Sequence, residues 1–438
     1  MMSALAVGWI GIAALFALLA LRVPIGAALA VVSIGGITVM TNHVAALGIV
    51  SALPFTFIGD WSLTAIPMFL LMGFVAANTG LTAGAFDLMR LLLRRVPGGL
   101  ASASVAACGL FAAASGSSIA TTAAMSRIAV PEMLRAGYRP SLATGVVTAS
   151  GTLGSLIPPS ILMVLYGIFT EQSIGQLFIA GIVPGILSAL IYMAMITVRA
   201  IVDPSLAPAR ATGRVAPGEL GRLVLAVWPF PLLIVGVLGG IFGGFFTPTE
   251  AGAVGAFLAC AIAALRGQLT RAALGTAVRQ TVVATASIFF LSIGAIMFTR
   301  FMGLSGVPDQ LADAMLSVST EPLVVIAMIA LLFIVLGMVI DSIGLMLLTL
   351  PVLLPVLEAA NVDLIWFGII VIKLLEIGLV TPPVGLNLYV MHSALSGKVR
   401  LGEILRGTTW FLAMDLVTLV LLILVPGLTL ALPTLMRG

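Results

Sequence analysis

The sequence is poor in charge, cysteine and histidine, and each shortage excludes a class of protein. Only 8% of its 438 residues are charged, too few to cover the surface of a water-soluble domain. Cys108 and Cys260 stand in apolar surroundings and cannot build a disulfide framework, so we interpret them as packing residues. His43 and His392 are too far apart in sequence to indicate a metal pair.

Motifs of enzymes and nucleotide-binding proteins are also missing. The chain has no His-Glu-x-x-His zinc motif and no Gly-x-x-x-x-Gly-Lys-Ser/Thr loop, so we expect no ATP to bind in that way. An intramembrane enzyme would need a nucleophile with a base or a set of metal ligands, and no such set stands out. We therefore expect that the protein is not an enzyme.

What the sequence has in excess is apolar surface. Hydrophobic residues make up 61% of the chain, and the mean hydropathy is +1.26. These values predict an all-α polytopic membrane protein. The first apolar run, Ala4–Leu21, lacks a basic flank and a small-residue cleavage site, so we interpret it as a membrane span and not as a signal peptide.

About ten transmembrane helices follow from a span length of roughly 20 residues. They are predicted near residues 4–21, 24–40, 65–88, 142–169, 176–198, 223–243, 249–265, 281–303, 364–392 and 408–430. Two more apolar stretches, 99–134 and 322–358, carry a polar point near the middle and are predicted to be re-entrant hairpins, turning at Ser115–Thr122 and at Asp341–Gly344. The alternative for the second stretch is that it forms two full membrane spans joined by a solvent-exposed loop that contains Asp341.

The basic residues predict the orientation in the membrane. If the N-terminus lies outside, nearly all Arg and Lys residues fall on the inner side, as the positive-inside rule requires. This placement explains the net charge of +4 without a nucleic-acid partner. Both termini are therefore expected on the periplasmic side.

An internal duplication covers nearly the whole chain. An offset of 224 residues relates Pro158 to Pro382, and it also relates Ser118 to Ser342. We predict a first repeat over residues 1–200, a cytoplasmic linker over 201–222 and a second repeat over 223–438. Each repeat contains an odd number of crossings, so the two should have inverted topology.

Each repeat contains a helix that cannot be continuous. Gly151–Ser160 and Gly378–Gly385 both include two successive prolines, which remove backbone donors and clash with the preceding turn. Unpaired backbone groups persist at membrane depth only where they are buried in protein or line a polar cavity. Two broken helices in corresponding halves are typical of a carrier with its binding site at the breaks.

The hairpin tips and the breaks supply candidate ligands. Ser118 and Ser342 are predicted to cap the returning hairpin arms, where exposed amides favour an anion. Oxygen atoms near the tips and breaks are predicted to hold one small cation per repeat. The candidate cation-site residues, which the resemblance described below implies to be sodium sites, are Ser115, Gly116, Ser117, Gly151, Thr152, Gly154, Ser155, Asp341, Gly344, Gly378 and Thr381. For any single Ser or Thr, the alternative is that its hydroxyl donates a hydrogen bond to a backbone carbonyl of its own helix.

Four charged residues lie in or beside predicted spans. Lys373 and Glu376 are three residues apart on one helical face and can neutralise each other. Glu250 follows a proline and can stabilise the start of its helix. Arg300 has no close partner in sequence. Its guanidinium could read a substrate carboxylate, or it could extend to the outer surface or pair with Asp309 or Asp313.

At these residues the sequence resembles the large membrane subunit of tripartite ATP-independent periplasmic (TRAP) transporters. The resemblance is carried, in order, by Val96–Leu100, Ser115–Thr122, Pro131–Met133, Gly137–Tyr138, Ile157–Ile161, Ala180–Gly185, Phe246–Gly252 and Glu376–Asn387. One departure is Ser126-Arg127, where the family usually has glycine followed by a small residue.

The resemblance implies a secondary transporter of the bacterial inner membrane that imports small organic acids with sodium by an elevator movement. It also implies two partners, a small membrane subunit of four spans and a soluble periplasmic substrate-binding protein. The candidate substrate contacts are Arg300 in the span 281–303 and, at or beside the tips and breaks, Ser118, Ser342, Pro158, Pro382 and Asn387. The nearest alternative is a carrier that works alone, possibly driven by protons through Glu376, Glu250 or Asp341; a channel would not need two broken helices.

Overall fold

The computed structural model describes residues 3–81, 83–208 and 218–437, and over these residues the regular structure is entirely helical. This confirms the predicted all-α class. Within these described ranges, eight helical segments are long and apolar enough to cross a membrane. The helices α1 and α2, at 17 and 16 residues, are shorter than a full span. The middle of the predicted linker, residues 209–217, lies outside the described residues.

The helices of the first half follow one another closely. They are α1 (Ala4–Ala20), α2 (Ile25–Met40), α3 (His43–Ile58), the 3₁₀ helix η1 (Trp61–Thr64), α4 (Ala65–Asn78), α5 (Ala83–Leu93), α6 (Gly99–Ser115), α7 (Ser118–Arg135), α8 (Pro140–Ser150), α9 (Leu153–Leu156), α10 (Ile161–Phe169) and α11 (Ile174–Val202).

The helices of the second half begin after the predicted linker's undescribed residues. They are α12 (Glu219–Val227), α13 (Pro229–Ile234), the π-helix η2 (Val235–Gly239), α14 (Gly240–Phe242), α15 (Pro248–Leu265), α16 (Arg271–Ser305), α17 (Val307–Val318), α18 (Pro322–Gly337), α19 (Ser342–Ala359), α20 (Leu364–Val380), α21 (Leu386–Ala394), α22 (Leu401–Leu424) and α23 (Gly427–Arg437).

The offset of 224 residues carries helices of the first half onto helices of the second. It moves α7 from 118–135 to 342–359, the bounds of α19, and it moves the start of α5 from 83 to 307, the start of α17. The correspondence fails at α3, η1 and α4, which are separate elements, because their counterpart is the single 35-residue helix α16. The two halves thus share most of their helices but divide some of them differently: α1 also corresponds to α13, η2 and α14, and α8 with α9 corresponds to the single helix α20.

Two predicted spans end earlier in the structure than the sequence indicated. The predicted span 65–88 is wrong, because α4 ends at Asn78 and the chain turns through Gly80 at a φ of +69°, a conformation that favours glycine. The predicted span 408–430 is also wrong at its end. Helix α22 stops at Leu424, since Pro426 has no amide to continue it and disfavours a helical residue before it.

Both predicted broken helices are confirmed. The first is divided into α8, α9 and α10, with extended backbone at Ile157 and Ser160. The second is divided into α20 and α21, with Thr381 extended and Gly385 left-handed. The Pro158-Pro159 and Pro382-Pro383 peptide bonds are both cis. The regions predicted as hairpins are the helix pairs α6 with α7 and α18 with α19.

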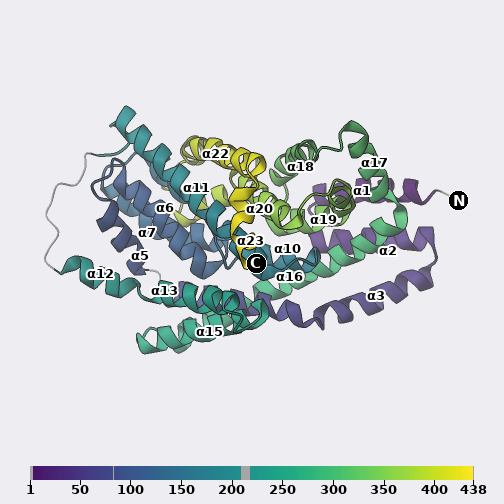
Figure 1. The fold of residues 1–438 in the computed structure, drawn as a ribbon, viewed down its shortest axis with the longest axis horizontal. Helices are drawn as coiled ribbons and strands as arrows, with labels where there is room; N and C mark the ends of the chain where they lie inside the picture. The colour runs from purple at the N-terminus through teal and green to yellow at the C-terminus, as the bar shows by residue number, and fades with distance from the viewer. Residues whose placement is uncertain (1–2, 82, 209–217, 438) are drawn as a thin grey trace.

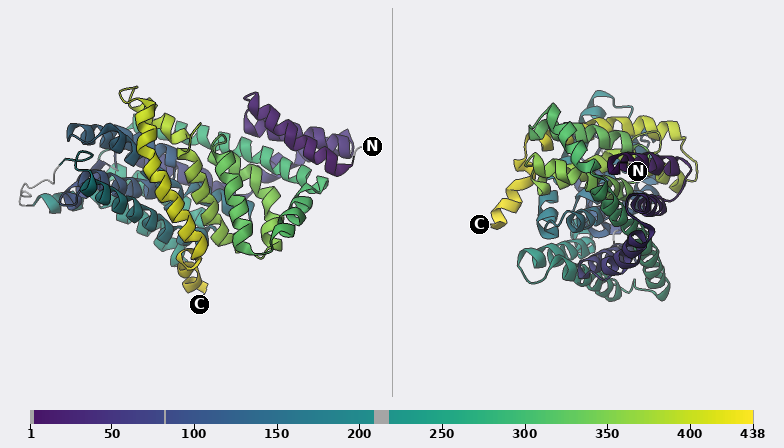
Figure 2. Two further views of the ribbon diagram at one scale, coloured as in Figure 1. Left: turned by 90° about the horizontal axis from the view of Figure 1, so that it is seen from above. Right: turned by 90° about the vertical axis from the view of Figure 1, so that its right-hand side faces the viewer.

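The helices surround a central group that contains the breaks (Figure 1). In the view of Figure 1, α5, α6, α7 and α12 lie at the left and α1, α2, α3 and α17 at the right, while α10, α19 and α20 lie between them. Figure 2 shows that α22 crosses the molecule as one long helix beside this group. Helices α8 and α22 touch through their backbones, because a Cβ atom at Gly145 would lie 2.5 Å from the Gly407 carbonyl carbon.

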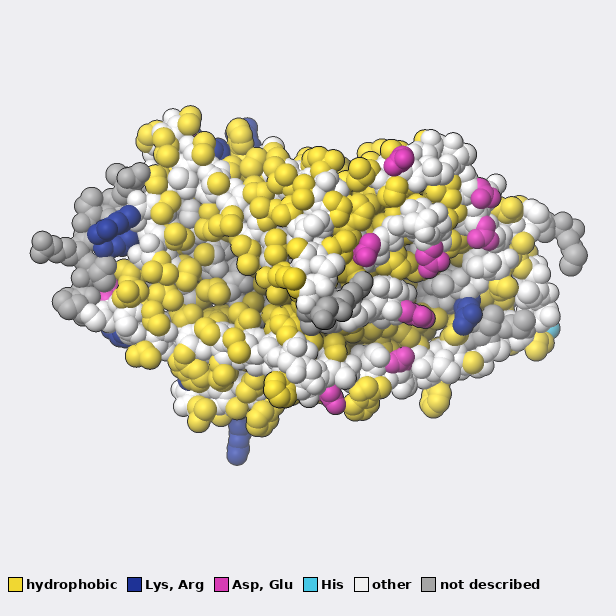
Figure 3. Space-filling model, viewed as in Figure 1, with side chains coloured by type: hydrophobic (Ala, Val, Ile, Leu, Met, Phe, Trp, Pro, Cys, Tyr) yellow, Lys and Arg dark blue, Asp and Glu magenta, His cyan; other side chains and the backbone are white. Residues whose placement is uncertain are grey.

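The outer surface is mostly apolar, and its charges are separated. On the face in Figure 3, Lys and Arg gather mainly at the left end, and Asp and Glu lie mainly on the right half. Near the start of the predicted linker, Arg139 pairs with Asp203 at 3.4 Å. The Ser205 hydroxyl donates to Asp203 and lowers the pKa of that carboxyl group below its usual value.

Candidate functional site

Each helix pair turns at a short segment, which we call its tip: Ser115–Ser118 between α6 and α7 is the first tip, and Met338–Ser342 between α18 and α19 is the second. At each tip, a side chain caps the start of the second helix. Ser117 caps α7 and accepts from the Ala120 amide at 3.4 Å, while Asp341 caps α19 and accepts from the Gly344 amide at 3.0 Å. The prediction that Ser118 and Ser342 are the caps was wrong by one position. The residues before them have the extended backbone that a cap requires, so Ser118 and Ser342 are the first residues inside the helices.

The first tip is packed directly on the first break. The Ser118 hydroxyl lies 3.2 Å from the Thr152 carbonyl oxygen and 2.5 Å from the Ser155 hydroxyl oxygen. The Ile161 amide donates to the Gly116 carbonyl at 3.4 Å. Gly154 permits this approach, since a Cβ atom there would lie 2.8 Å from the Ser117 carbonyl oxygen.

The second tip contacts the second break in the same manner. The Val384 amide donates to the Met338 carbonyl at 3.2 Å. A Cβ atom on Gly378 would lie 2.9 Å from the Gly337 carbonyl oxygen, so the two chain segments meet backbone to backbone. The turn of this pair lies at Met338–Asp341, a little earlier than the predicted Asp341–Gly344.

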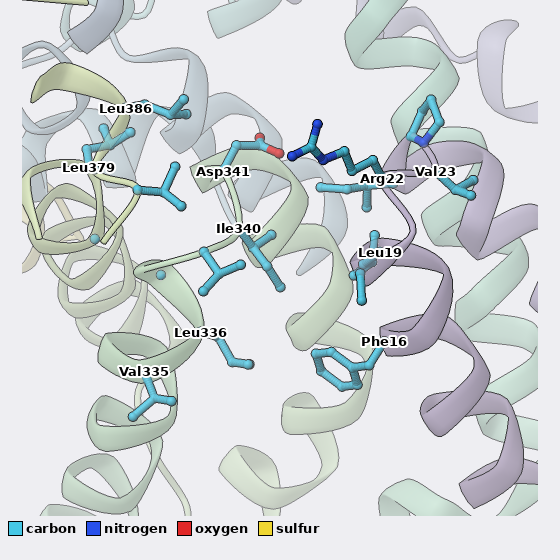
Figure 4. A pocket seen from close by; sticks show the side chains of 18 residues that line it. Phe16, Leu19, Arg22, Val23, Val335, Leu336, Ile340, Asp341, Leu379 and Leu386 are labelled. Carbon is cyan, nitrogen blue, oxygen red and sulfur yellow. The ribbon is translucent and has the colours of Figure 1, made fainter. Parts of the chain in front are cut away.

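Both tips and both breaks open on one cavity. Its volume is about 430 Å³, and it is lined by Gly116, Ser117, Ser118, Ser155, Asp341, Ser342, Leu379 and Leu386, with walls from α4 and α16. A second cavity of about 540 Å³ shares Asp341, Leu379 and Leu386 and extends to the corner between α1 and α2. Figure 4 shows the Arg22 guanidinium in this second cavity pointing toward the Asp341 carboxylate.

Three of the predicted cation ligands form hydrogen bonds through their hydroxyl groups to residues nearby in sequence. Thr152 Oγ1 donates to the Ala149 carbonyl at 2.7 Å, and Thr381 Oγ1 donates to the Ile377 carbonyl at 2.5 Å. These are the bonds to the same helix that the sequence left open as an alternative. The Ser115 hydroxyl lies 3.0 Å from the Thr121 hydroxyl, within the first tip.

At the first break, three hydroxyl groups that were not among the predicted ligands have no hydrogen-bond partner. The side chains of Thr122, Ser150 and Ser160 are buried and have no hydrogen-bond partner. Thr122 lies against Gly151, because a Cβ atom there would be 1.9 Å from Thr122 Oγ1. Buried polar groups are normally paired, so these oxygen atoms indicate a place for a ligand. Sequence alone could not separate them from the hydroxyls that bond to their own helices.

The second tip and the second break contribute a different set of polar side chains. Asp341 brings a carboxylate, and the Ser342 hydroxyl and both polar side-chain atoms of Asn387 are buried without a partner. The stretches 115–122 and 150–161 around the first tip and break contain no acidic residue. The two halves are therefore alike in backbone and different in charge.

Arg300 is not brought to the cavity between the tips. It lines a separate cavity of about 920 Å³, together with Asp60, Phe57 and Phe169. Among the described residues it forms no ion pair within 4.0 Å, with Asp309, Asp313 or any other acid. Its role in binding substrate stays a prediction. The helix-stabilising role considered for Glu250 is confirmed, because Glu250 and Thr247 form a capping box at the start of α15.

A buried charge cluster lies beside the breaks, and the sequence revealed only part of it. Lys373 Nζ lies 3.1 Å from Glu376 Oε2, as its spacing predicts, and 2.6 Å from Asp415 Oδ1 on α22. Tyr192 on α11 donates to Asp415 at 2.5 Å. The available signal for Asp415 was an acidic residue alone in the apolar stretch Thr408–Leu424.

The fold and the site together define a polytopic membrane transport protein. The structure is similar to the YdaH transporter of Alcanivorax borkumensis, with a TM-score of 0.63 over 89% of this chain and 90% of that chain, and the 16% identity limits this likeness to the fold. Residues 12–428 match the family model of the tripartite ATP-independent periplasmic transporter DctM component. The chain belongs to this family of large permease subunits.

Curated relatives cover most of the chain. The C4-dicarboxylate TRAP transporter large permease protein DctM of Pseudomonas aeruginosa is 36% identical over 85% of this chain and 86% of its own length. The sialic acid TRAP transporter large permease protein SiaM of Vibrio cholerae is 33% identical over 87% and 88%. The isethionate TRAP transporter permease protein DctMQ of Oleidesulfovibrio alaskensis is 34% identical over 89% of this chain and 60% of its own length.

Proposed function

We propose that the protein is the permease subunit of a sodium-driven importer of a small organic acid. The observation that carries the proposal is the convergence of two capped helix tips and two broken helices on one cavity of about 430 Å³. Helix starts favour anions, and uncommitted oxygen atoms favour a small cation. The three relatives are named for C4-dicarboxylates, sialic acid and isethionate, which all carry an acidic group.

The residues present suit a sodium ion as the coupling ion. The first break holds the uncommitted hydroxyls of Thr122, Ser150 and Ser160, and the second tip holds the Asp341 carboxylate. Oxygen ligands are those that hard cations prefer. The proposal includes an elevator movement, in which the tips and breaks carry the site across the membrane past the helices α1, α2, α4 and α16 that line the two cavities.

We also propose two partners in an inner-membrane complex whose permease has both termini on the periplasmic side. One is a small four-span membrane subunit, and the other is a soluble periplasmic protein that delivers the acid. Support comes from the tripartite class of the family and from the greater length of the DctMQ relative, of which this chain matches 60%. Reconstitution in proteoliposomes with and without each partner tests this: uptake should require both, and full uptake by the permease alone would indicate a stand-alone carrier.

The sodium requirement should depend on Asp341. Asp341→Asn keeps an oxygen that can cap α19, so the fold should be retained. It removes the one carboxylate that lines the cavity between the tips. We expect the sodium concentration for half-maximal uptake to rise roughly tenfold, the effect of about 1.4 kcal/mol of lost attraction.

The matched control is Asp60→Asn, which removes an exposed carboxylate that caps η1 and lines the separate cavity around Arg300. Its sodium requirement should equal that of the unmodified protein. Uptake that ignores sodium and follows a pH gradient would refute sodium coupling and favour a proton-driven carrier.

A further inference from the structure

The cluster of Lys373, Glu376 and Asp415 contains two acidic groups and one basic group. All three side chains are completely buried, and when all are ionised one negative charge is left over. One oxygen atom of each carboxylate, Glu376 Oε1 and Asp415 Oδ2, has no hydrogen-bond partner. An isolated buried charge is costly, so the excess charge of this cluster must be balanced, either by a positive charge nearby or by a bound proton.

No neighbouring side chain in the described part of the structure supplies that charge. Helix α11 contributes Ser188, 3.4 Å from Lys373 Nζ, and Tyr192, which donates to Asp415. Helix α22 contributes Asp415 alone. The charged groups that act on Lys373 are Asp415 and Glu376, and those that act on Glu376 are Lys373 and Asp415. The packed helices α9, α10, α18, α19, α21 and α23 add no charged group to the cluster.

The cluster reaches the first break through Tyr192. The Tyr192 hydroxyl bonded to Asp415 also lies beside the Thr152 side chain. Thr152 is the residue whose carbonyl oxygen faces the Ser118 hydroxyl at the first tip. Polar groups of Asp415, Tyr192, Thr152 and Ser118 therefore follow one another from the cluster to the first tip.

The first break offers oxygen atoms for a cation but no negative charge. It has buried hydroxyls without partners at Thr122, Ser150 and Ser160, and no acidic residue in its own stretches. A monovalent cation held there by neutral oxygens alone would lack a counter-charge. Asp341, the acid of the shared cavity, lies at the second tip, where it caps α19.

We propose that the Lys373–Glu376–Asp415 cluster supplies the counter-charge for a sodium ion bound at the first break. Glu376 and Asp415 are positioning residues in this role: they do not touch the ion, and they act through the electric field and through Tyr192. The repeat supports a dedicated role for the cluster. The counterparts of Lys373, Glu376 and Asp415 are Ala149, Thr152 and Ile191, so these charges exist in one half only, and the break without an acidic residue lies in the other half. This inference rests on the proposed sodium coupling.

The test measures sodium binding without transport. Purified protein in lipid nanodiscs is titrated with sodium at constant ionic strength, with choline as the replacement cation, and the midpoint of thermal unfolding is followed. Glu376→Gln and Asp415→Asn each remove the excess charge with little change in shape. We expect each variant to raise the half-saturating sodium concentration roughly tenfold, the effect of one unit charge acting through protein of intermediate dielectric constant.

Two further variants separate charge from packing. Glu376→Asp keeps the charge and should restore most of the sodium affinity, while Glu358→Gln removes an exposed carboxylate at the end of α19 and should change nothing. Unchanged affinity in both Glu376→Gln and Asp415→Asn would overturn the inference and indicate that a proton balances the cluster. Equal losses in Glu376→Gln and Glu376→Asp would also overturn it, because packing would then be the cause.

The outcomes also separate this inference from the proposed function. If sodium stabilises the unmodified protein and the cluster variants alike, sodium coupling survives and the role of the cluster fails. If sodium does not stabilise the unmodified protein at all, both fail.

Discussion

Gly154→Ala is expected to abolish most transport. The added methyl carbon would lie 2.8 Å from the Ser117 carbonyl oxygen and 2.9 Å from the Ser118 amide nitrogen. These are backbone atoms of the first tip, so no side-chain rotation can relieve the contact. The tip must move away from the break, which separates the Ser118 hydroxyl from Thr152 and Ser155. Overpacking of this kind costs about 1–3 kcal/mol.

The expected result is a loss of uptake of roughly tenfold or more, since about 1.4 kcal/mol corresponds to a factor of ten. Gly378→Ala should act similarly at the second break, where the new carbon would lie 2.9 Å from the Gly337 carbonyl oxygen. Initial rates of sodium-dependent uptake, normalised to the amount of folded protein, measure the effect.

The matched control is Gly303→Ala. Gly303 lies in the regular helix α16, and a Cβ atom there would meet nothing within 4 Å. Alanine favours a helix over glycine, so this variant should be as active as the unmodified protein and equally stable or slightly more stable. If Gly154→Ala transports as well as Gly303→Ala, contact between the tip and the break is not required for transport.

Lys373→Met should have the largest effect on stability. It replaces the cation with an apolar side chain of similar length and leaves Glu376 and Asp415 buried without their common donor. Removing one partner of a buried ion pair typically costs about 3–5 kcal/mol, because the remaining charge is uncompensated. We expect a large fall in the midpoint of thermal unfolding in detergent, or a low yield of folded protein.

A compensated variant provides the control. Lys373→Met combined with Glu376→Gln and Asp415→Asn leaves no charge in the cluster, and it should recover a large part of the lost stability. Equal instability of the single and the triple variant would show that loss of the lysine side chain, and not uncompensated charge, destabilises the protein.

The elements that the sequence predicted correctly depend on local chemistry. Two prolines in succession remove two backbone donors wherever they occur, so the breaks after Leu156 and Val380 could be located without knowledge of the neighbours. The duplication could be found from the constant offset of 224 residues between matching positions. The low content of charged residues was enough to indicate a membrane protein. The pairing of Lys373 with Glu376 also followed from spacing within one helix.

The tertiary structure decided which distant groups meet. Asp415 lies 42 residues from Lys373 in sequence and 2.6 Å from it in space, because α22 packs along α20. The sequence could not show which cavity Arg300 faces, and the packing of α16 places it in a cavity with Asp60, separate from the one between the tips. Local rules determine where a helix starts, breaks or caps, but the partner of a buried charge depends on how helices from both halves pack.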